Sequence, residues 1–275
     1  MPETWAGELG EFRASSSASG GTSLTTTATF IQFPALATPG NKLKGHLIVT
    51  PRNFATAVVV KVAFNPWLTI LKTTNGMTTA PTDYSIEAQD GSTDTSVDLS
   101  SLDTVANGDW VLIGSHQQFR GFRVDVDGTN STLTTTAAIH FWNGGNWVAY
   151  SITDGTKSST ALDQDGLLYW TPTSNWQKIT FRTLYPELKH DAYYSDIPMY
   201  WVRYSFDKAL DSAVTLDSLL AANRSTAYGE LLSGQSLEQK FTYGFGGLGN
   251  VEALTNDGTA NLVVNVVTVK DSEFA

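Results

Sequence analysis

A chain of 275 residues, 41% of them hydrophobic and only 16% charged, can bury a substantial core but lacks the charge of a solvated helical bundle. Its 27 acidic and 17 basic residues give a net charge of −10. That charge repels phosphate backbones, and the basic residues are scattered, so we expect no direct nucleic-acid partner. The absence of cysteine excludes disulfides, thiolate nucleophiles and cysteine-bound zinc.

The beginning of the chain has the composition of an arm. Its first residues carry acids rather than the basic and apolar run of a secretion signal, and no apolar run is long enough to cross a bilayer. We therefore expect assembly in the cytoplasm and no membrane partner. Residues 13–29 are rich in Ser, Thr and Gly, so residues 1–29 are predicted to form an arm. Such an arm is ordered when it packs on its own domain or on neighbouring subunits.

The segments that flank the middle of the chain predict a small β domain. Residues 44–50 and 56–64 are rich in β-branched residues and are bounded by Pro and Asn turns. Residues 75–104 are acidic and rich in turns, with little to bury, which indicates a boundary or a long loop. Residues 261–270 predict one long strand that returns to pair with residues 58–64. This domain is expected to comprise residues 30–85 and 221–275.

Residues 86–220 predict a second and larger β module. Alternating or β-rich runs occur at residues 109–114, 119–126, 137–151, 166–170, 176–181 and 199–206. The third run is a hairpin around Asn143-Gly144, a pair typical of tight turns. Turns recur every 8–12 residues, the spacing of a sandwich or jelly roll. Only residues 216–223 and 228–237 suggest short helical turns, so the fold class is all-β: a sandwich or jelly-roll-like module with a second, smaller β domain.

Four motifs occur in order within about residues 105–220. They are Gly108–Ser115 (GDWVLIGS), Phe119–Val126 (FRGFRVDV), Phe141–Trp147 (FWNGGNW) with Thr153–Thr156 (TDGT), and Gly166–Trp176 (GLLYWTPTSNW) with Tyr200–Arg203 (YWVR). Together they resemble a Trp-rich β module of tailed-bacteriophage virion structural proteins. The resemblance covers less than half of the chain. It implies a place on the outside of a particle, on head or tail, and other virion proteins as partners.

The aromatic residues of this block also have a physical interpretation of their own. Large tryptophan side chains can stabilise a cysteine-free sandwich by packing. Arg203 follows Trp201 by two positions on a predicted strand, so both point to one face, where a cation–π contact is expected. The tryptophans that we assign to the core are Trp142, Trp147, Trp170, Trp176 and Trp201.

Motifs for catalysis are missing from the sequence. The four histidines stand far apart and form no zinc motif, and there is no nucleophile elbow. The glycine-rich segment 244–250 lacks a phosphate-binding lysine, so we predict a loop. A glycosidase pair among the 27 acidic residues remains an open alternative, because only their separation in space would reveal it. We expect a protein that is not an enzyme.

Two Asp-Gly segments are candidates for calcium. Asp125, Asp127 and Asn130 surround Gly128 and offer oxygen ligands at alternating positions. The segment Asp163–Gly166 has a similar pattern. The alternative is that both are ordinary turns, in which Asp and Gly are the favoured residues. No other cofactor is expected.

Two further sets of residues follow from the functional hypotheses. In the first, the chain is a non-enzymatic virion component, such as a capsid decoration or cement protein or an accessory tail or baseplate subunit. It is expected to form a homo-oligomer, with subunits tied by the arm and the C-terminal strand, for which Arg13, Phe30, Phe33, Val264 and Val266 are the candidate residues. In the alternative, the chain is a carbohydrate-binding module for host attachment, in which Trp5, Trp67, Trp110, Tyr193 and Tyr194 contact the glycan, unless these rings are core residues.

Overall fold

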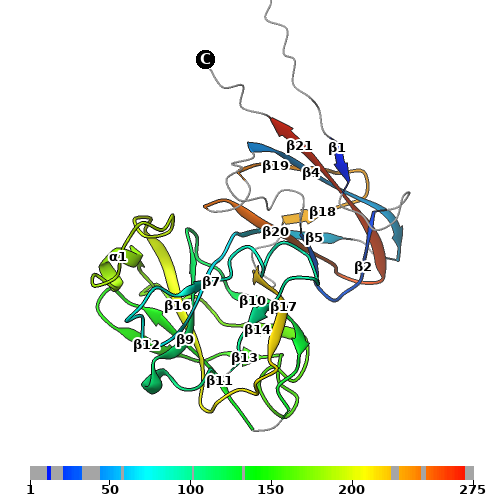
Figure 1. Ribbon diagram of the computed structural model, residues 1–275. Helices are drawn as coiled ribbons and strands as arrows, with labels where there is room; N and C mark the ends of the chain where they lie inside the picture. Colours follow the sequence, from blue (N-terminus) through cyan, green and yellow to red (C-terminus); the bar gives the residue numbers. More distant parts are fainter. Residues whose placement is uncertain are drawn as a thin grey trace, which may run out of the picture. The chain divides into compact units, whose positions relative to one another are not determined.

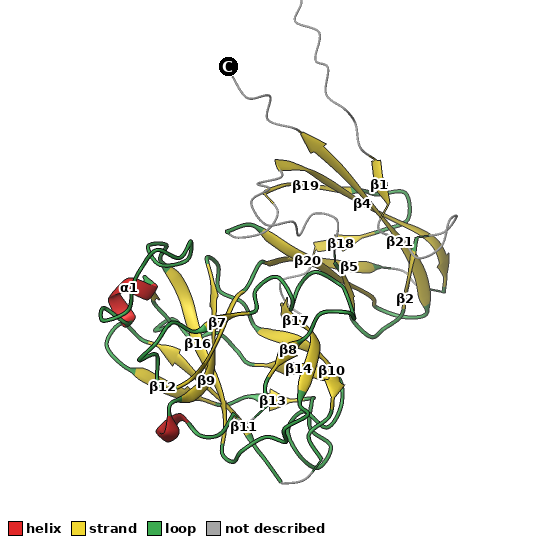
Figure 2. Ribbon diagram, in the orientation of Figure 1, coloured by secondary structure: helices red, strands yellow, loops and turns green. Residues whose placement is uncertain are grey.

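The computed structural model of the chain is almost entirely β (Figures 1 and 2), with 48% of residues in strands and 3% in helices. It describes residues 11–13, 21–32, 44–56, 59–100, 102–131, 134–223, 229–242 and 246–269. Its described helices are single turns, η2 (Val105–Asn107) and α1 (Phe181–Leu184). None of them has the length and apolar character that crossing a bilayer requires. The all-β fold class is confirmed.

The chain divides into two compact units. Unit 1 comprises residues 1–65 and 225–275, and unit 2 comprises residues 66–224. The first unit is therefore discontinuous, as predicted, but residues 66–85 belong to unit 2 rather than to the smaller domain. The reason is strand pairing: β6 (Thr69–Thr74) pairs along its whole length with β9 (Asp109–Ser115).

Unit 1 contains two sheets, which we call A and B. Sheet A has the order β1 (Glu11–Arg13), β21 (Thr259–Val269), β4 (Lys44–Ala55), β19 (Leu237–Thr242), and β2 (Thr22–Leu24) also pairs with β21. Sheet B has the order β18 (Gly229–Leu231), β5 (Val60–Pro66), β20 (Leu248–Thr255), β3 (Thr29–Ile31). The sheets lie against each other, with β20 next to β2 and β21 (Figure 1).

Alternation along the central strands of sheet A explains its packing. Val49 on β4 and Val264 on β21 are paired and buried, whereas the neighbouring pair of Ile48 and Asn265 is partly exposed. Successive side chains of a strand point to opposite faces of the sheet, so every second residue of these strands faces the interior. The long C-terminal strand was predicted correctly, but its partner was not: β21 pairs with β4 over ten residue pairs, not with residues 58–64.

Unit 2 is a sandwich of two further sheets, C and D. Sheet C has the order β12 (Trp147–Tyr150), β11 (Ala137–Trp142), β16 (Met199–Phe206), β9, β6, β7 (Thr82–Asp83), and β15 (Lys178–Ile179) also pairs with β16. Sheet D has the order β13 (Thr153–Asp154), β14 (Gly166–Tyr169), β10 (Gly121–Gly128), β17 (Thr215–Ala222), β8 (Val97–Asp98). The hairpin between β11 and β12 turns at Asn143-Gly144, as predicted.

Aromatic side chains dominate the core between sheets C and D. Phe119 meets Trp170 and Trp176 edge to face at centroid distances of 5.4 and 5.2 Å. Phe122 of sheet D meets Tyr204 of sheet C in the same way at 5.1 Å. Such pairs stabilise a fold by about 0.5–1.5 kcal/mol each beyond the burial of their area. The prediction that Trp170 and Trp176 are core residues is confirmed.

The face of sheet C that points away from this core is also covered. Trp201 is fully buried there and lies over Gly114 of the neighbouring strand. Its indole nitrogen donates a hydrogen bond of 2.9 Å to the carbonyl of Ile179. Phe181 of α1 packs against Trp201 at 6.1 Å and against Tyr194 at 5.1 Å. The chain between β15 and β16 therefore caps the sheet with aromatic side chains.

Two local predictions are wrong. Residues 216–222 form β17 and residues 229–231 form β18, where we expected helical turns. Leu216 and Leu219 are buried in the sandwich core, so tertiary packing overrides the weak helical signal. The connection 75–104 also buries more than we predicted, because Val97, Leu99 and Leu102 are core residues.

Candidate functional site

The predicted calcium set is not brought together. On β10, the Asp125 carboxylate accepts a 2.9 Å hydrogen bond from the Ser218 hydroxyl, and Asp127 accepts one of 3.0 Å from the Thr215 hydroxyl. Asn130 is buried instead, and its amide donates to the Thr160 hydroxyl and the Ala161 carbonyl at 3.1 Å each. Its side chain closes a loop, so Asn130 does not join the two carboxylates. Among the described residues, no three acidic or histidine side chains form a group that could hold a metal.

Acidic side chains nevertheless gather on the outer face of sheet D. Burial and the negative charges of Asp127, Asp125 and Asp165 raise the pKa of Asp217. Arg123 lies among them, 2.5 Å from Asp125 and 3.6 Å from Asp165. These four carboxylates and one guanidinium together form a negatively charged group.

The second Asp-Gly segment is a braced turn. The Asp163 carboxylate accepts hydrogen bonds from the backbone N–H groups of Ser158, Ser159 and Thr160 at 2.7, 2.7 and 3.1 Å, and from the Ser159 hydroxyl at 3.0 Å. These donors hold the pKa of Asp163 at about 2 against the opposing effect of burial. All four favour the ionised form. The interpretation of this segment as an Asp turn, rather than a cation site, fits this geometry.

Most of the predicted glycan-contacting rings are inside the protein. Trp67, Trp110 and Tyr194 are only 5–6% exposed, and burial raises the pKa of the Tyr194 hydroxyl to about 12. Stacking on a sugar needs an exposed ring face, so the assignment of these three residues is wrong. Tyr193 is 50% exposed and packs edge to face on Tyr194 at 5.1 Å. Trp5 lies outside the described residues.

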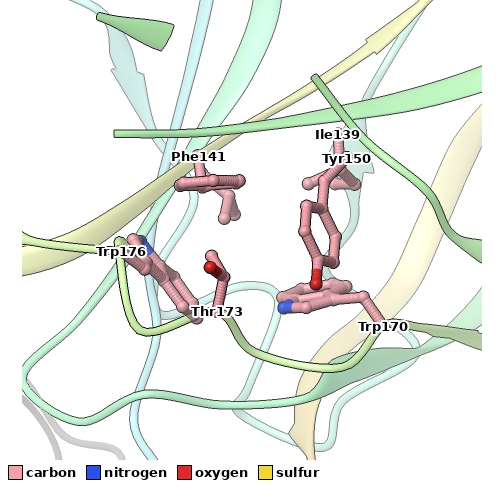
Figure 3. Close-up of a pocket in the computed structure, with 7 residues that line it drawn as sticks. Ile139, Phe141, Tyr150, Trp170, Thr173 and Trp176 are labelled. Carbon is pink, nitrogen blue, oxygen red and sulfur yellow. The ribbon is translucent and has the colours of Figure 1, made fainter. Parts of the chain in front are cut away.

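A small aromatic pocket lies at the edge of the unit 2 core (Figure 3). Its space for a water-sized group is about 10 Å³, far below the roughly 300–1,000 Å³ of ligand sites. Figure 3 shows the Tyr150 ring reaching toward Trp170, with Thr173 between Trp170 and Trp176. The walls are core side chains, so we interpret the pocket as a packing space that admits one small group. Its lining residues are Ile139, Phe141, Tyr150, Trp170, Thr173, Trp176 and Val202.

The most unusual arrangement on the outer face of sheet C is a cation between two indoles. The Arg203 guanidinium carbon lies 4.2 Å from the ring centroid of Trp110 and 4.2 Å from that of Trp147. One terminal nitrogen donates a 3.1 Å hydrogen bond to the Tyr185 hydroxyl. Trp142 extends the stack by meeting Trp147 edge to face at 5.5 Å. We call Trp110, Arg203 and Trp147 the indole–guanidinium sandwich.

The electrostatics of this sandwich agree with a partly buried, structural cation. Burial lowers the pKa of Arg203, and the Tyr185 hydroxyl opposes that shift. His140 lies opposite Arg203 on β11. Burial and the positive charge of Arg203 lower the pKa of His140, which favours its neutral form. The predicted cation–π contact of Arg203 exists, but its partners are Trp110 and Trp147 rather than Trp201.

Comparisons of the chain with protein-family models, with curated proteins and with solved structures find no match. The assignment of a function therefore depends on the geometry of the chain itself and on the motifs in residues 105–220.

The residues predicted for assembly have mixed positions. Val264 is buried within sheet A, so it stabilises its own subunit, and its assignment to a subunit contact is wrong. Arg13 and Val266 are on β1 and β21, which pair with each other. Phe30 is partly exposed on β3 and lies opposite Glu252 of β20. Phe33 lies outside the described residues.

The paired parts of the N-terminal arm therefore pack on their own domain. Residues 11–13 and 22–24 both add to β21 of the same chain. The sequence reasoning missed two features that depend on this architecture: the contact of Gly114 with Trp201 and the open edge at β19. A glycine within a β-rich run was the available signal for the first, because such a glycine marks a close approach.

Proposed function

We propose that the chain is a non-enzymatic structural component of a tailed-phage virion. It would act as an exterior decoration or cement protein of the head, or as an accessory subunit of the tail or baseplate. The observation that carries the proposal is that the motif residues behind the phage resemblance make stabilising contacts. Trp110, Gly114 and Trp147 come from these motifs, as do Trp201 and Arg203, and all five hold sheet C together.

These contacts suit a durable particle component. In a chain without cysteine, durability must come from packing, because no disulfide can restrict the unfolded state. Each cation–π contact adds about 0.5–2 kcal/mol, depending on how far the cation is removed from water. The indole–guanidinium sandwich links three strands of sheet C, β9, β16 and β12, through side-chain contacts.

The polar groups that first suggested other functions fit the same interpretation. Asp163 braces a loop, Asn130 closes one, and Asp125 and Asp127 each accept a hydrogen bond from β17. Side chains that are already bonded in this way are poorly placed to bind a metal or to transfer protons. The proposed mechanism is therefore oligomeric shape, in which β units pack against other virion proteins after assembly in the host cytoplasm.

The test is to find the chain on particles. Phage particles from the host that carries the gene would be purified on a density gradient, and an antibody raised against the chain would be located by electron microscopy. We expect regular labelling of the outer surface, and the labelled part distinguishes head from tail. If the chain stays in the soluble fraction and the particles remain unlabelled, the proposal is wrong.

A further inference from the structure

Strand β19 is the longest of the described strands that end a sheet. It is six residues long and pairs on one side with β4, from Leu237 opposite Val49 to Thr242 opposite Lys44. No described strand pairs with its other side. The other described strands that end a sheet or pair beside its main order are two to four residues long. A free edge presents unpaired N–H and C=O groups that another strand can bind.

Three successive residues of β19 face solvent. Glu238, Gln239 and Lys240 are all exposed. The Glu238 carboxylate contacts the ring nitrogen Nδ1 of His46 on β4 and keeps 57% of its side chain exposed. Leu232, in the turn before the strand, is 47% exposed, which is unusual for a large apolar side chain here. The strand carries no proline, a residue that commonly blocks edge pairing.

The order of charges on β19 is self-complementary. The strand contains Glu238, Gln239 and Lys240 in succession. When two copies pair antiparallel about a two-fold axis at Gln239, Glu238 of each copy lies opposite Lys240 of the other. Opposite charges that face each other across strands stabilise pairing, and like charges destabilise it. The two-fold arrangement repeats the favourable pair on both sides of the axis.

We propose that two copies of the chain associate through β19, pairing antiparallel about Gln239 and joining their A sheets into one continuous sheet. This inference goes beyond the proposed function and does not depend on it, since the pairing would occur in the isolated chain. The lateral contact of two six-residue strands is small, so the dimer forms in a concentration-dependent manner.

Charge reversal tests the register. Analytical ultracentrifugation over a range of concentrations would compare the unaltered chain with Glu238→Lys, Lys240→Glu and the double variant. Each single change places like charges opposite each other twice, and we expect it to weaken the dimer by about tenfold or more. The double change restores the complementary pairs, so its dissociation constant should return to within about threefold of the original. Glu187→Lys, an exposed reversal in unit 2, is the matched control and should change nothing.

A cysteine scan supplies a second readout. The chain has no cysteine, so Gln239→Cys introduces a single thiol. Residues directly opposite each other on antiparallel strands have Cα atoms about 4.5–5.5 Å apart, which lies within the range for a disulfide. We expect Gln239→Cys to form a covalent dimer under mild oxidation. Ser233→Cys, exposed in the preceding turn, should remain monomeric on a non-reducing gel.

The outcomes are distinct. A chain that is monomeric at every concentration, with no cross-link at residue 239, overturns the inference. A dimer that ignores both single reversals overturns it too, because another surface must then form the contact. Weakening by both single reversals without recovery in the double variant would also contradict the two-fold register, because the copies would then pair about a residue other than Gln239. Thermal melting of each variant shows whether the fold is retained.

Discussion

Replacement of Gly114 by alanine is expected to destabilise unit 2. A Cβ atom at this position would lie 2.4–2.8 Å from three ring atoms of Trp201, closer than van der Waals contact permits. The ring cannot move freely, because it is fully buried and its indole nitrogen is bonded to the Ile179 carbonyl at 2.9 Å. Overpacking of this kind costs about 1–3 kcal/mol, more than the gain of up to about 1 kcal/mol from removing a flexible glycine.

Differential scanning calorimetry measures this effect. A loss of about 2 kcal/mol in the free energy of unfolding corresponds to a fall in Tm of about 4–8 °C for a unit of this size, and the fall should appear in the transition of unit 2. Gly145→Ala is the matched control, because its nearest neighbour, the side chain of Asn143, is 4.0 Å away. Adding Trp201→Phe to Gly114→Ala should reduce the cost of the alanine, since the smaller ring leaves room. If Gly114→Ala melts like Gly145→Ala, the close packing inferred here is wrong.

Three further predictions concern other contacts. Arg203→Met should lower the free energy of unfolding, measured in urea, by about 1–3 kcal/mol, because two cation–π contacts are lost. Arg203→Lys should have an intermediate stability, because an ammonium lacks the planar stacking surface of a guanidinium. Equal stability of the unaltered chain and both variants would contradict this role of Arg203. The pKa of Asp163 is held at about 2, below its unfolded value of about 3.9, so its stabilisation is complete above about pH 4–5 and is lost as pH falls through 2. Asp163→Asn should therefore lower the free energy of unfolding by about 1–2 kcal/mol at pH 7, after allowance for solvent screening. The stability of this variant should also fall less steeply as the pH is lowered, and the same fall in both chains would refute this prediction. Millimolar calcium should leave Tm unchanged, because Asn130 is bonded to Thr160 and Ala161, and a rise of several degrees would reinstate a calcium site.

Local sequence patterns predicted the elements that depend on neighbouring residues. The hairpin at Asn143-Gly144 is one example: the Asn143 side chain accepts hydrogen bonds from the N–H groups of Gly145 and Asn146, and Gly144 has a φ of 99°. Both features belong to residues within three positions of each other. The alternation of Phe122, Arg123 and Val124 likewise predicted which side chains of β10 face the core.

Predictions that required knowledge of distant partners were less successful. The strand at residues 259–269 was identified from its composition, but its pairing with β4 was not, because several strands share the same β-branched character. Trp67 and Trp110 were candidates for sugar contact, since sequence does not reveal whether an aromatic ring is covered. For the same reason the sequence did not reveal that Asn130, two positions beyond Gly128, turns its side chain inward to the loop at Thr160.

Composition and the alternation of residues were enough to predict that this protein is all-β, and the same sequence gives it no disulfide and a net charge of −10. These properties depend only on which residues are present and on the order of near neighbours along the chain. The tertiary structure decided which tryptophans are buried, that Arg203 lies between Trp110 and Trp147, and that β19 is left with an open edge. Contacts of this kind join residues tens to hundreds of positions apart, and only the pairing order of the strands brings them together.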